Sequence, residues 1–135
     1  MHQLGFTYIY DYSSEDESVL LPVSLRVGSE QVRMAASIDT GASFCMFGAE
    51  IAEALGLTLD RGAHMRFRTA NSVFEAFGHE VEISVLGVVT NAMVYFFADP
   101  AIEKNVLGRT GWLDRVRVGL VHHDSKVYLA PYDRG

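Results

Sequence analysis

The sequence predicts an all-β domain in which short strands form a closed barrel with one or two short helices. Three observations support this prediction. Apolar and polar residues alternate over many short runs, turn-forming residues separate most of these runs, and only two short stretches have helical spacing. The chain has 135 residues, of which 49% are hydrophobic, enough for one domain with its own core. We expect residues 1–18 to form an N-terminal strand and acidic arm, and residues 19–135 to form the domain.

The residue pattern in the N-terminal part of the chain predicts a strand, a polar arm and a hairpin. Residues 6–10 form the first strand, and the polar, acidic residues 13–18 follow it as a loop or arm. Residues 19–27 and 31–38 are two strands separated by a Gly-Ser pair that suits a tight turn.

The middle of the chain predicts a short helix and then a projecting hairpin. Residues 44–47 form a short strand that leads into a helix over residues 48–55, which has apolar side chains on one face and a glycine after it. Residues 64–69 and 73–83 are the two strands of the hairpin.

The C-terminal part predicts further strands and a second short helix. Residues 85–97 are either two strand runs or one bent run, and residues 106–107 are the end of a buried strand. Residues 110–115 form a short helix whose first residue, a threonine, is a suitable N-cap. Residues 116–121 and 126–130 close the chain as a hairpin.

The tetrapeptide Asp39-Thr40-Gly41-Ala42 follows a predicted strand and is the candidate catalytic site. An acid protease needs a rigid carboxylate that shares a proton with a second one, because two close carboxylates do not both ionise easily. Asp39 would emerge from the end of a buried strand, Gly41 would let the backbone turn close beneath it, and the Thr40 hydroxyl could lock the turn. The alternative interpretation is a simple turn between two strands.

A second motif makes this region resemble the retropepsins, the retroviral-type aspartic proteases. Residues 105–109, Asn-Val-Leu-Gly-Arg, lie about 65 residues after the tetrapeptide. In that family an apolar-apolar-Gly segment packs beside the catalytic turn. The resemblance covers roughly residues 19–130, is stronger to cellular and bacterial members than to viral ones, and implies the acid-protease barrel.

The resemblance also implies a role for each matching residue. Asp39 matches the catalytic aspartate, Thr40 the threonine that bonds across a dimer, and Gly41 the glycine that faces the catalytic water and the substrate backbone. Gly108 and Arg109 match residues that support the site, and the arginine braces the dimer end of the barrel. The residues expected to bind substrate are Ala42, Met46, Ala70, Asn71 and Val106.

The resemblance predicts which substrates the pockets accept. The pocket residues are uncharged, so the substrate residues that flank the cleaved bond should be apolar or aromatic. Lys104 lies near the rim and would tolerate an acidic substrate residue further out. Phe67, Phe74 and Phe77 fit either a cover for these pockets or the core.

Two positions depart from the viral pattern. Ser43 stands where viral members often have an aspartate that pairs with the arginine, so Arg109 needs another partner, namely Asp114, Asp124 or the neighbouring subunit. Residues 69–72, at the tip of the projecting hairpin, contain no glycine, which implies a flap stiffer than the viral kind.

A chain with one such aspartate provides half of an acid-protease site. A two-fold homodimer would place Asp39 against its copy on the symmetry axis. One carboxylate would accept a proton from the attacking water, while the protonated one would hydrogen-bond to the carbonyl oxygen of a peptide or protein substrate. This chemistry needs no metal and no organic cofactor.

Composition argues against several other classes of function. The net charge is −6 with no basic stripe, so we expect no nucleic-acid partner. No apolar run approaches the roughly 20 residues of a membrane span and the N-terminus does not resemble a signal peptide, so we expect a cytoplasmic protein with no membrane partner. We interpret Cys45 as a small core residue, and the adjacent His122 and His123 as part of a turn with poor geometry for a metal.

Two alternatives to a homodimeric peptidase remain. One is a retropepsin-fold module that binds peptides or dimerises with little proteolysis, which the glycine-free hairpin tip and the altered surroundings of Arg109 favour. The other is a monomer whose second half-site comes from a different protein.

Overall fold

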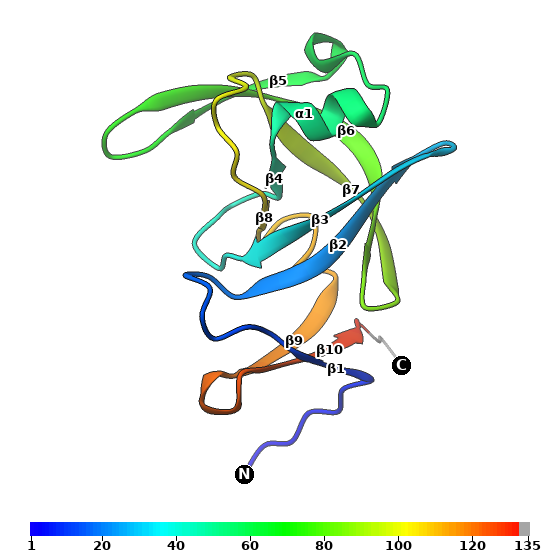
Figure 1. Cartoon of the computed structure of the whole chain (residues 1–135), viewed down its shortest axis with the longest axis vertical. Coiled ribbons are helices and arrows are strands. Elements are labelled where there is room, and N and C mark those ends of the chain that lie inside the picture. Colours follow the sequence, from blue (N-terminus) through cyan, green and yellow to red (C-terminus); the bar gives the residue numbers. More distant parts are fainter. Residues whose placement is uncertain (133–135) are drawn as a thin grey trace.

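Two β-sheets make up most of the protein (Figure 1). The structure is a computed structural model and describes residues 1–132. In these residues, a larger sheet has the strand order β2-β3-β8-β4-β7-β6-β5, and a smaller one, which we call the terminal sheet, has the order β1-β10-β9. The strands are β1 (Tyr8–Asp11), β2 (Leu20–Val27), β3 (Glu30–Ile38), β4 (Met46–Phe47), β5 (Ala63–Arg68), β6 (Val73–Val85), β7 (Val88–Phe97), β8 (Val106–Leu107), β9 (Val116–Val121) and β10 (Lys126–Pro131).

Strand alternation explains how the larger sheet buries one of its faces. In β2, Leu21, Val23 and Leu25 are buried and the residues between them are more exposed, because successive side chains point to opposite faces. These side chains belong to the main core together with Ile83 of β6 and Phe96 of β7. Full burial of one such apolar side chain contributes about 1.5–3 kcal/mol to the free energy of unfolding.

The pairing of the larger sheet combines antiparallel hairpins with two parallel contacts. β2 and β3 form the predicted first hairpin, while β5, β6 and β7 form an antiparallel meander. β3 runs parallel to β8 and β4 runs parallel to β7. β2 also pairs with β6, so it has a strand neighbour on each side.

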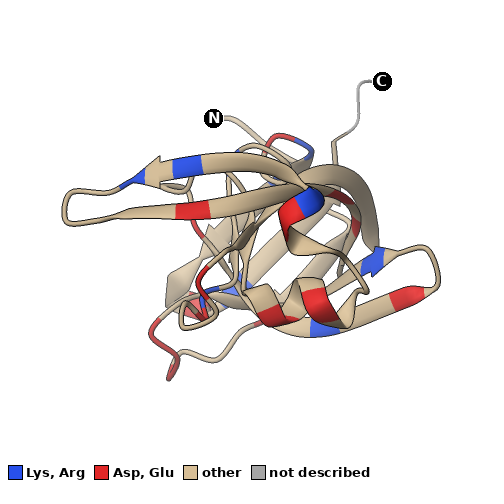
Figure 2. Cartoon of the chain, turned by 90° about the horizontal axis from the view of Figure 1, so that it is seen from above, with Lys and Arg blue, Asp and Glu red and all other residues tan. Residues whose placement is uncertain are grey.

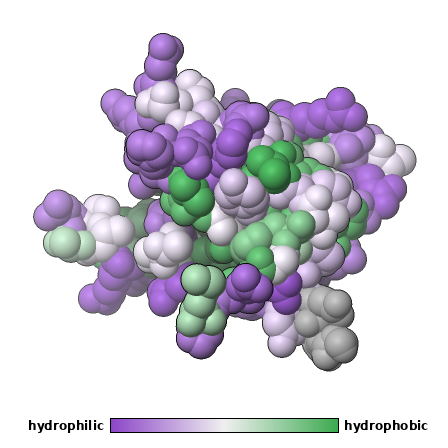
Figure 3. Space-filling view, turned by 90° about the horizontal axis from the view of Figure 1, so that it is seen from below, coloured by the Kyte–Doolittle hydropathy of each residue, from purple (hydrophilic) through white to green (hydrophobic). Residues whose placement is uncertain are grey.

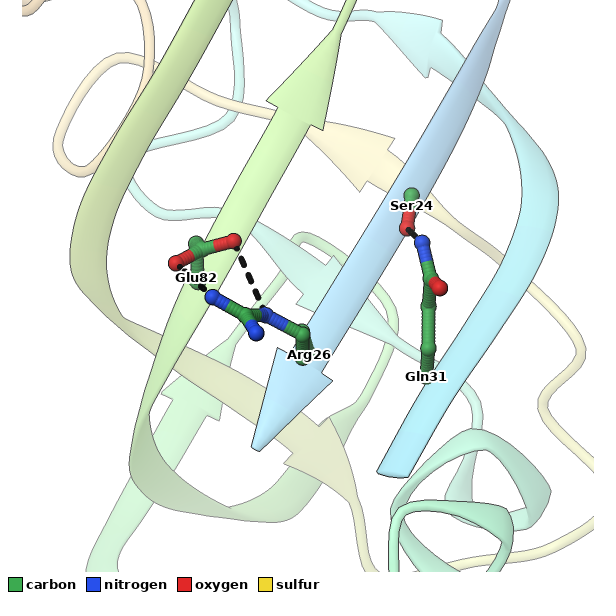
Figure 4. A network of polar contacts seen from close by, with 4 residues as sticks. All are labelled: Ser24, Arg26, Gln31 and Glu82. Atoms are coloured by element: carbon green, nitrogen blue, oxygen red, sulfur yellow. Dashed lines mark hydrogen bonds and ion pairs between the residues drawn. The ribbon is translucent and has the colours of Figure 1, made fainter. Parts of the chain in front are cut away.

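Polar contacts tie β2 to both of these neighbours (Figure 4). The guanidinium of Arg26 donates two hydrogen bonds to the Glu82 carboxylate on β6, from Nε to Oε1 at 3.1 Å and from Nη2 to Oε2 at 2.8 Å. These bonds lower the pKa of Glu82 and raise that of Arg26. On the other side of β2, Gln31 of β3 donates to the hydroxyl of Ser24 at 2.6 Å. The two contacts help to fix the register of β3, β2 and β6.

The N-terminal and C-terminal segments together form the terminal sheet. β10 lies at its centre and pairs antiparallel with β1 and β9. An ion pair between Lys126 of β10 and Asp11 of β1 adds to this pairing. The strand predicted at residues 6–10 is therefore present as β1, with slightly later bounds. Residues 133–135 of the predicted domain lie outside the described residues.

The helices of the described residues are short. They are α1 (Ala49–Ala54) and two single 3-10 turns, η1 (Leu59–Arg61) and η2 (His122–Asp124). α1 confirms the helix predicted over residues 48–55, and it packs Ile51 and Ala52 against the core. The prediction of a mostly β fold with few short helices is confirmed. No helix in residues 1–132 has the length and apolar character needed to cross a membrane.

The helix predicted over residues 110–115 is wrong, since turns occupy most of this segment. Thr110 does not cap a helix, because it forms an isolated parallel bridge with Phe44. Gly111 has a φ of +108°, which lies outside the helical region, and its N–H donates to the side chain of Asp114 at 3.0 Å. Contacts with a distant segment therefore override the helical spacing of the apolar residues.

Candidate active site

Asp39 lies at the end of β3, beside the parallel strand β8. Its backbone N–H donates to the carbonyl of Leu107 at 3.0 Å, which extends the pairing by one residue. Its half-buried side chain accepts the N–H of Gly41 at Oδ1 over 2.9 Å, and its carbonyl accepts the N–H of Ala42 at 3.2 Å. Thr40 and Gly41 are exposed next to it. The turn thus fixes the direction of one carboxylate while leaving it open to solvent.

The segment after β8 braces this turn from the other side. The N–H of Arg109 donates to the carbonyl of Ala42 at 2.9 Å. At Gly108, an added Cβ would lie 2.2 Å from the carbonyl oxygen of Phe44 and 2.9 Å from that of Ala42. Only glycine allows the two segments to approach this closely. The two sequence motifs therefore meet in space, as the resemblance predicted.

A cleft of about 380 Å³ opens beside the Asp39 turn. The turn, the β5–β6 hairpin and the loop that enters β8 line it. Its apolar lining from outside the hairpin consists of Ala42, Phe44, Met46, Phe97, Ile102 and Val106.

Aromatic contacts hold the β5–β6 hairpin against this cleft. Phe67 of β5 meets Phe44 edge to face with ring centroids 5.9 Å apart, and it stacks on Phe74 of β6 at 5.4 Å. Phe74 in turn contacts Phe97 at 5.3 Å. Aromatic pairs of this kind contribute about 0.5–1.5 kcal/mol each beyond their buried area. The distal part of the hairpin, next to its tip, is therefore part of the cleft wall.

Three of the predicted substrate-binding residues line the cleft beside Asp39, namely Ala42, Met46 and Val106. The other two, Ala70 and Asn71, are exposed at the hairpin tip and do not line the cleft. Hydrogen bonds between Thr69 and Ser72 close a tight turn there, with the N–H of Ser72 3.1 Å from the Thr69 hydroxyl. Thr69 is the residue of this turn that lines the cleft.

The three hairpin phenylalanines differ in their position relative to the cleft. Phe67 and Phe74 line the cleft. Phe77 is not among the lining residues and packs beside His64, with ring centroids 5.2 Å apart. Phe44, Phe97 and Ile102 also line the cleft, and no sequence pattern predicts this, because their positions depend on how distant strands meet.

Arg109 finds a partner at the position where viral members have an acid. Its Nη2 donates to the hydroxyl of Ser43 at 3.3 Å. Asp114 instead lies 3.6 Å from Arg115, and in residues 1–132 no ion pair joins Arg109 to Asp114 or Asp124. Within the described residues the side-chain partner of Arg109 is therefore Ser43. Of the three partners predicted from the sequence, the neighbouring subunit stays a prediction.

Cys45 is fully buried next to Gly108. Its sulfur accepts the N–H of Gly108 at 3.4 Å, and burial raises the pKa of the thiol to about 11. The thiol is therefore neutral near pH 7, which does not suit a nucleophile. In residues 1–132 no group of three or more His, Cys, Asp or Glu side chains is placed to hold a metal ion.

Comparison with known proteins agrees with this geometry. A family described as aspartyl protease matches residues 23–111, about two thirds of the chain, a range that includes both the Asp39 turn and Gly108. The chain belongs to the aspartyl protease family. No curated protein matches this chain.

The solved structures similar to this chain include one described as a retropepsin-like aspartic protease from Rickettsia conorii. The two chains are 19% identical with a TM-score of 0.61, and the match covers 95% of this chain and 100% of the other. This likeness shows a retropepsin-like fold and confirms the resemblance drawn from the two motifs. Membership of the family supports aspartic peptidase activity in general.

Proposed function

We propose that this aspartyl protease is an endopeptidase that acts as a homodimer, with Asp39 of each subunit forming the catalytic pair. The observation that carries the proposal is the Asp39 turn, which fixes one half-buried carboxylate through the Gly41 N–H at the wall of an apolar cleft. The chain has one such turn. Acid-protease chemistry needs two carboxylates, so a second copy supplies the other.

The terminal sheet supports two-fold association. Figure 3 views the end of the molecule that carries this sheet, where apolar side chains are exposed between polar ones. Ile9, Leu120 and Val121 are 61%, 51% and 40% exposed. β1 and β9 are also edge strands of this sheet, and such edges can pair with another chain. In this arrangement Thr40, exposed beside Asp39, would meet its copy across the axis.

The proposal includes a closed barrel in each subunit. The pairing of β2 with both β3 and β6 supports closure, because it links the first hairpin to the meander. A closed barrel would hold the Asp39 turn rigidly at its rim.

The proposed mechanism uses one proton and one water. The ionised Asp39 accepts a proton from the water as the water oxygen attacks the carbonyl carbon of the peptide bond. The protonated Asp39 of the second subunit donates a hydrogen bond to the carbonyl oxygen. The carbon–nitrogen bond then breaks as the nitrogen receives a proton, and two peptides leave. In this mechanism the β5–β6 hairpin acts as a flap over the substrate.

The cleft also supports a substrate preference. Its lining near Asp39 is mainly apolar, so apolar or aromatic residues should flank the cleaved bond. Mapping cleavage sites in a peptide library tests this preference. Cleavage mainly beside Lys or Arg would contradict it.

The substitution Asp39→Asn tests the proposed function. In the homodimer it alters both carboxylates at once, so no general base remains and cleavage should fall to background. The free energy of unfolding should be unchanged or slightly higher, because holding two carboxylates close together destabilises the folded dimer. The measurements are peptide cleavage from acid to neutral pH, sedimentation and thermal melting. Cleavage at the wild-type rate by a folded Asp39→Asn dimer would contradict the proposed catalytic role of Asp39.

A specific observation also favours the second candidate, a module that binds peptides with little proteolysis. The Thr69–Ser72 hydrogen bonds and the aromatic contacts of the hairpin restrain the flap over the cleft. If the wild-type dimer binds apolar peptides but cleaves none between acid and neutral pH, this second function replaces the first.

A further inference from the structure

We propose that Arg68 and Lys104 form a basic rim that selects substrates with acidic side chains outside the apolar residues at the cleaved bond. This inference rests on the proposed function, since it concerns the substrate of the same cleft. It names the charge that the substrate carries and the two residues that recognise it.

Arg68 and Lys104 reach the cleft from different parts of the chain. Arg68 is the last residue of β5, and Lys104 lies in the loop that enters β8. Both residues line the same cleft as Asp39. Figure 2 shows the basic residues of β5 in blue along the projecting hairpin. A peptide that reaches Asp39 through this cleft would therefore pass both cations.

Neither cation is neutralised within the part of the chain that the structure describes. Arg66, two residues earlier on the same strand, lies 3.6 Å from the carboxylate of Glu75, which also pairs with His64 at 3.2 Å. No ion pair among residues 1–132 involves Arg68 or Lys104, and both residues are exposed. Asp39 is the one acidic side chain that lines the cleft in these residues.

The charge pattern of the whole chain makes this rim distinctive. The chain carries a net charge of −6, yet this cleft is lined by two cations, Arg68 and Lys104, that have no ion-pair partner among residues 1–132. Arg and Lys bind carboxylates by charge-assisted hydrogen bonds, and Arg can do so through two parallel bonds. In the proposed homodimer the two-fold axis would place a second rim on the other side of the cleaved bond. Acidic residues on both sides of an apolar centre should therefore favour binding.

The test compares two peptides with the same apolar centre and either Glu or Gln at the outer positions. At pH about 6 and low ionic strength, where Glu is ionised, we expect kcat/KM for the Glu peptide to be about 3- to 10-fold higher. Arg68→Gln and Lys104→Gln should each reduce this ratio, and the double substitution should bring it close to one. Arg66→Gln is the matched control and should keep the wild-type ratio.

A binding measurement separates failure of the rim from failure of the proposed catalysis. Fluorescence anisotropy with Asp39→Asn protein measures the affinity for both peptides without any cleavage. Preference for the Glu peptide that disappears in the double variant and in about 1 M salt supports the rim, whether or not the wild-type protein cleaves peptides. Equal affinity for the two peptides, or a preference that survives Arg68→Gln/Lys104→Gln, overturns it. Loss of cleavage alone overturns only the proposed function.

Discussion

At the scale of single residues, the close approach of two backbone segments at Gly108 determines how much change the site tolerates. Gly108→Ala would force a Cβ to within 2.2 Å of the Phe44 carbonyl oxygen, so the turn or the strand must shift. We expect a loss of about 3 kcal/mol or more in the free energy of unfolding, measured by chemical denaturation. Gly5→Ala is the control, since nothing lies within 4 Å of an added Cβ there. Equal stability of the two variants would contradict the observed packing.

Cys45 offers a second prediction at this scale. Because its thiol is buried and its pKa is raised to about 11, a thiol reagent at pH 8 should label the folded protein at least about 100-fold more slowly than the urea-unfolded protein. The rate of labelling against urea concentration provides the measurement. Cys45→Ala should retain the proposed peptidase activity. Loss of activity in a folded Cys45→Ala protein would instead indicate that Cys45 acts as a nucleophile.

At the scale of elements, the Arg26–Glu82 pair predicts a pH-dependent link between β2 and β6. Its hydrogen bonds make the pKa of Glu82 lower in the folded state than in the unfolded state. The stabilisation is therefore fully present above the unfolded pKa and is lost as pH falls through the folded pKa. Thermal melts of wild type and Glu82→Gln should differ at neutral pH and converge in acid.

Glu80→Gln is the matched control for that comparison, because Glu80 lies on the same strand and forms no ion pair with the described residues. Its melting temperature should follow that of the wild type across the whole pH range. A constant difference between wild type and Glu82→Gln down to acid pH would show that the pair does not act through the ionised carboxylate.

Elements that depend on local sequence were predictable, while those that depend on distant contacts were not. Alternation and turn residues predicted the β2–β3 and β5–β6 hairpins, because both the strands and the turns are encoded within a few residues. The segment after Gly108 is different, since the bridge from Thr110 to Phe44 and the positive φ of Gly111 replace the predicted helix.

The same distinction holds for the candidate site. The Asp39 turn and Gly108 were predictable because each belongs to a short motif. Arg68 and Phe44 were not, because they reach the cleft only when the hairpin packs against the turn. Ala70 and Asn71 lie at the exposed tip of the hairpin, within the tight turn between Thr69 and Ser72, and their contact with substrate stays a prediction.

At the scale of the whole molecule, the proposed dimer would have two contact regions, the Asp39 turns on the axis and the terminal sheets, and only the second is remote from the cleft lining. The cleft is lined by the Asp39 turn, strands of the larger sheet and the loop that enters β8, whereas the exposed residues Ile9, Leu120 and Val121 belong to the terminal sheet. Figure 1 shows the terminal sheet at the opposite end of the molecule from α1. A substitution in the terminal sheet can therefore weaken association without touching the cleft lining. This separation makes the dependence of activity on dimerisation measurable.

Leu120→Asp uses this separation to test the dimer. Each dimer would bury two such leucines, so replacing both with a charged residue should raise the dissociation constant by about 100-fold or more. Specific activity should fall on dilution in both the wild type and Leu120→Asp, but the fall should begin at a higher protein concentration in Leu120→Asp. Sedimentation should show the dimer dissociating at a correspondingly higher concentration in this variant. Ala54→Asp, on the exposed side of α1 at the opposite end of the molecule, should behave as the wild type. If Leu120→Asp has the same dilution curve as Ala54→Asp, the two subunits do not meet through the terminal sheet, and the second carboxylate must reach Asp39 by another route.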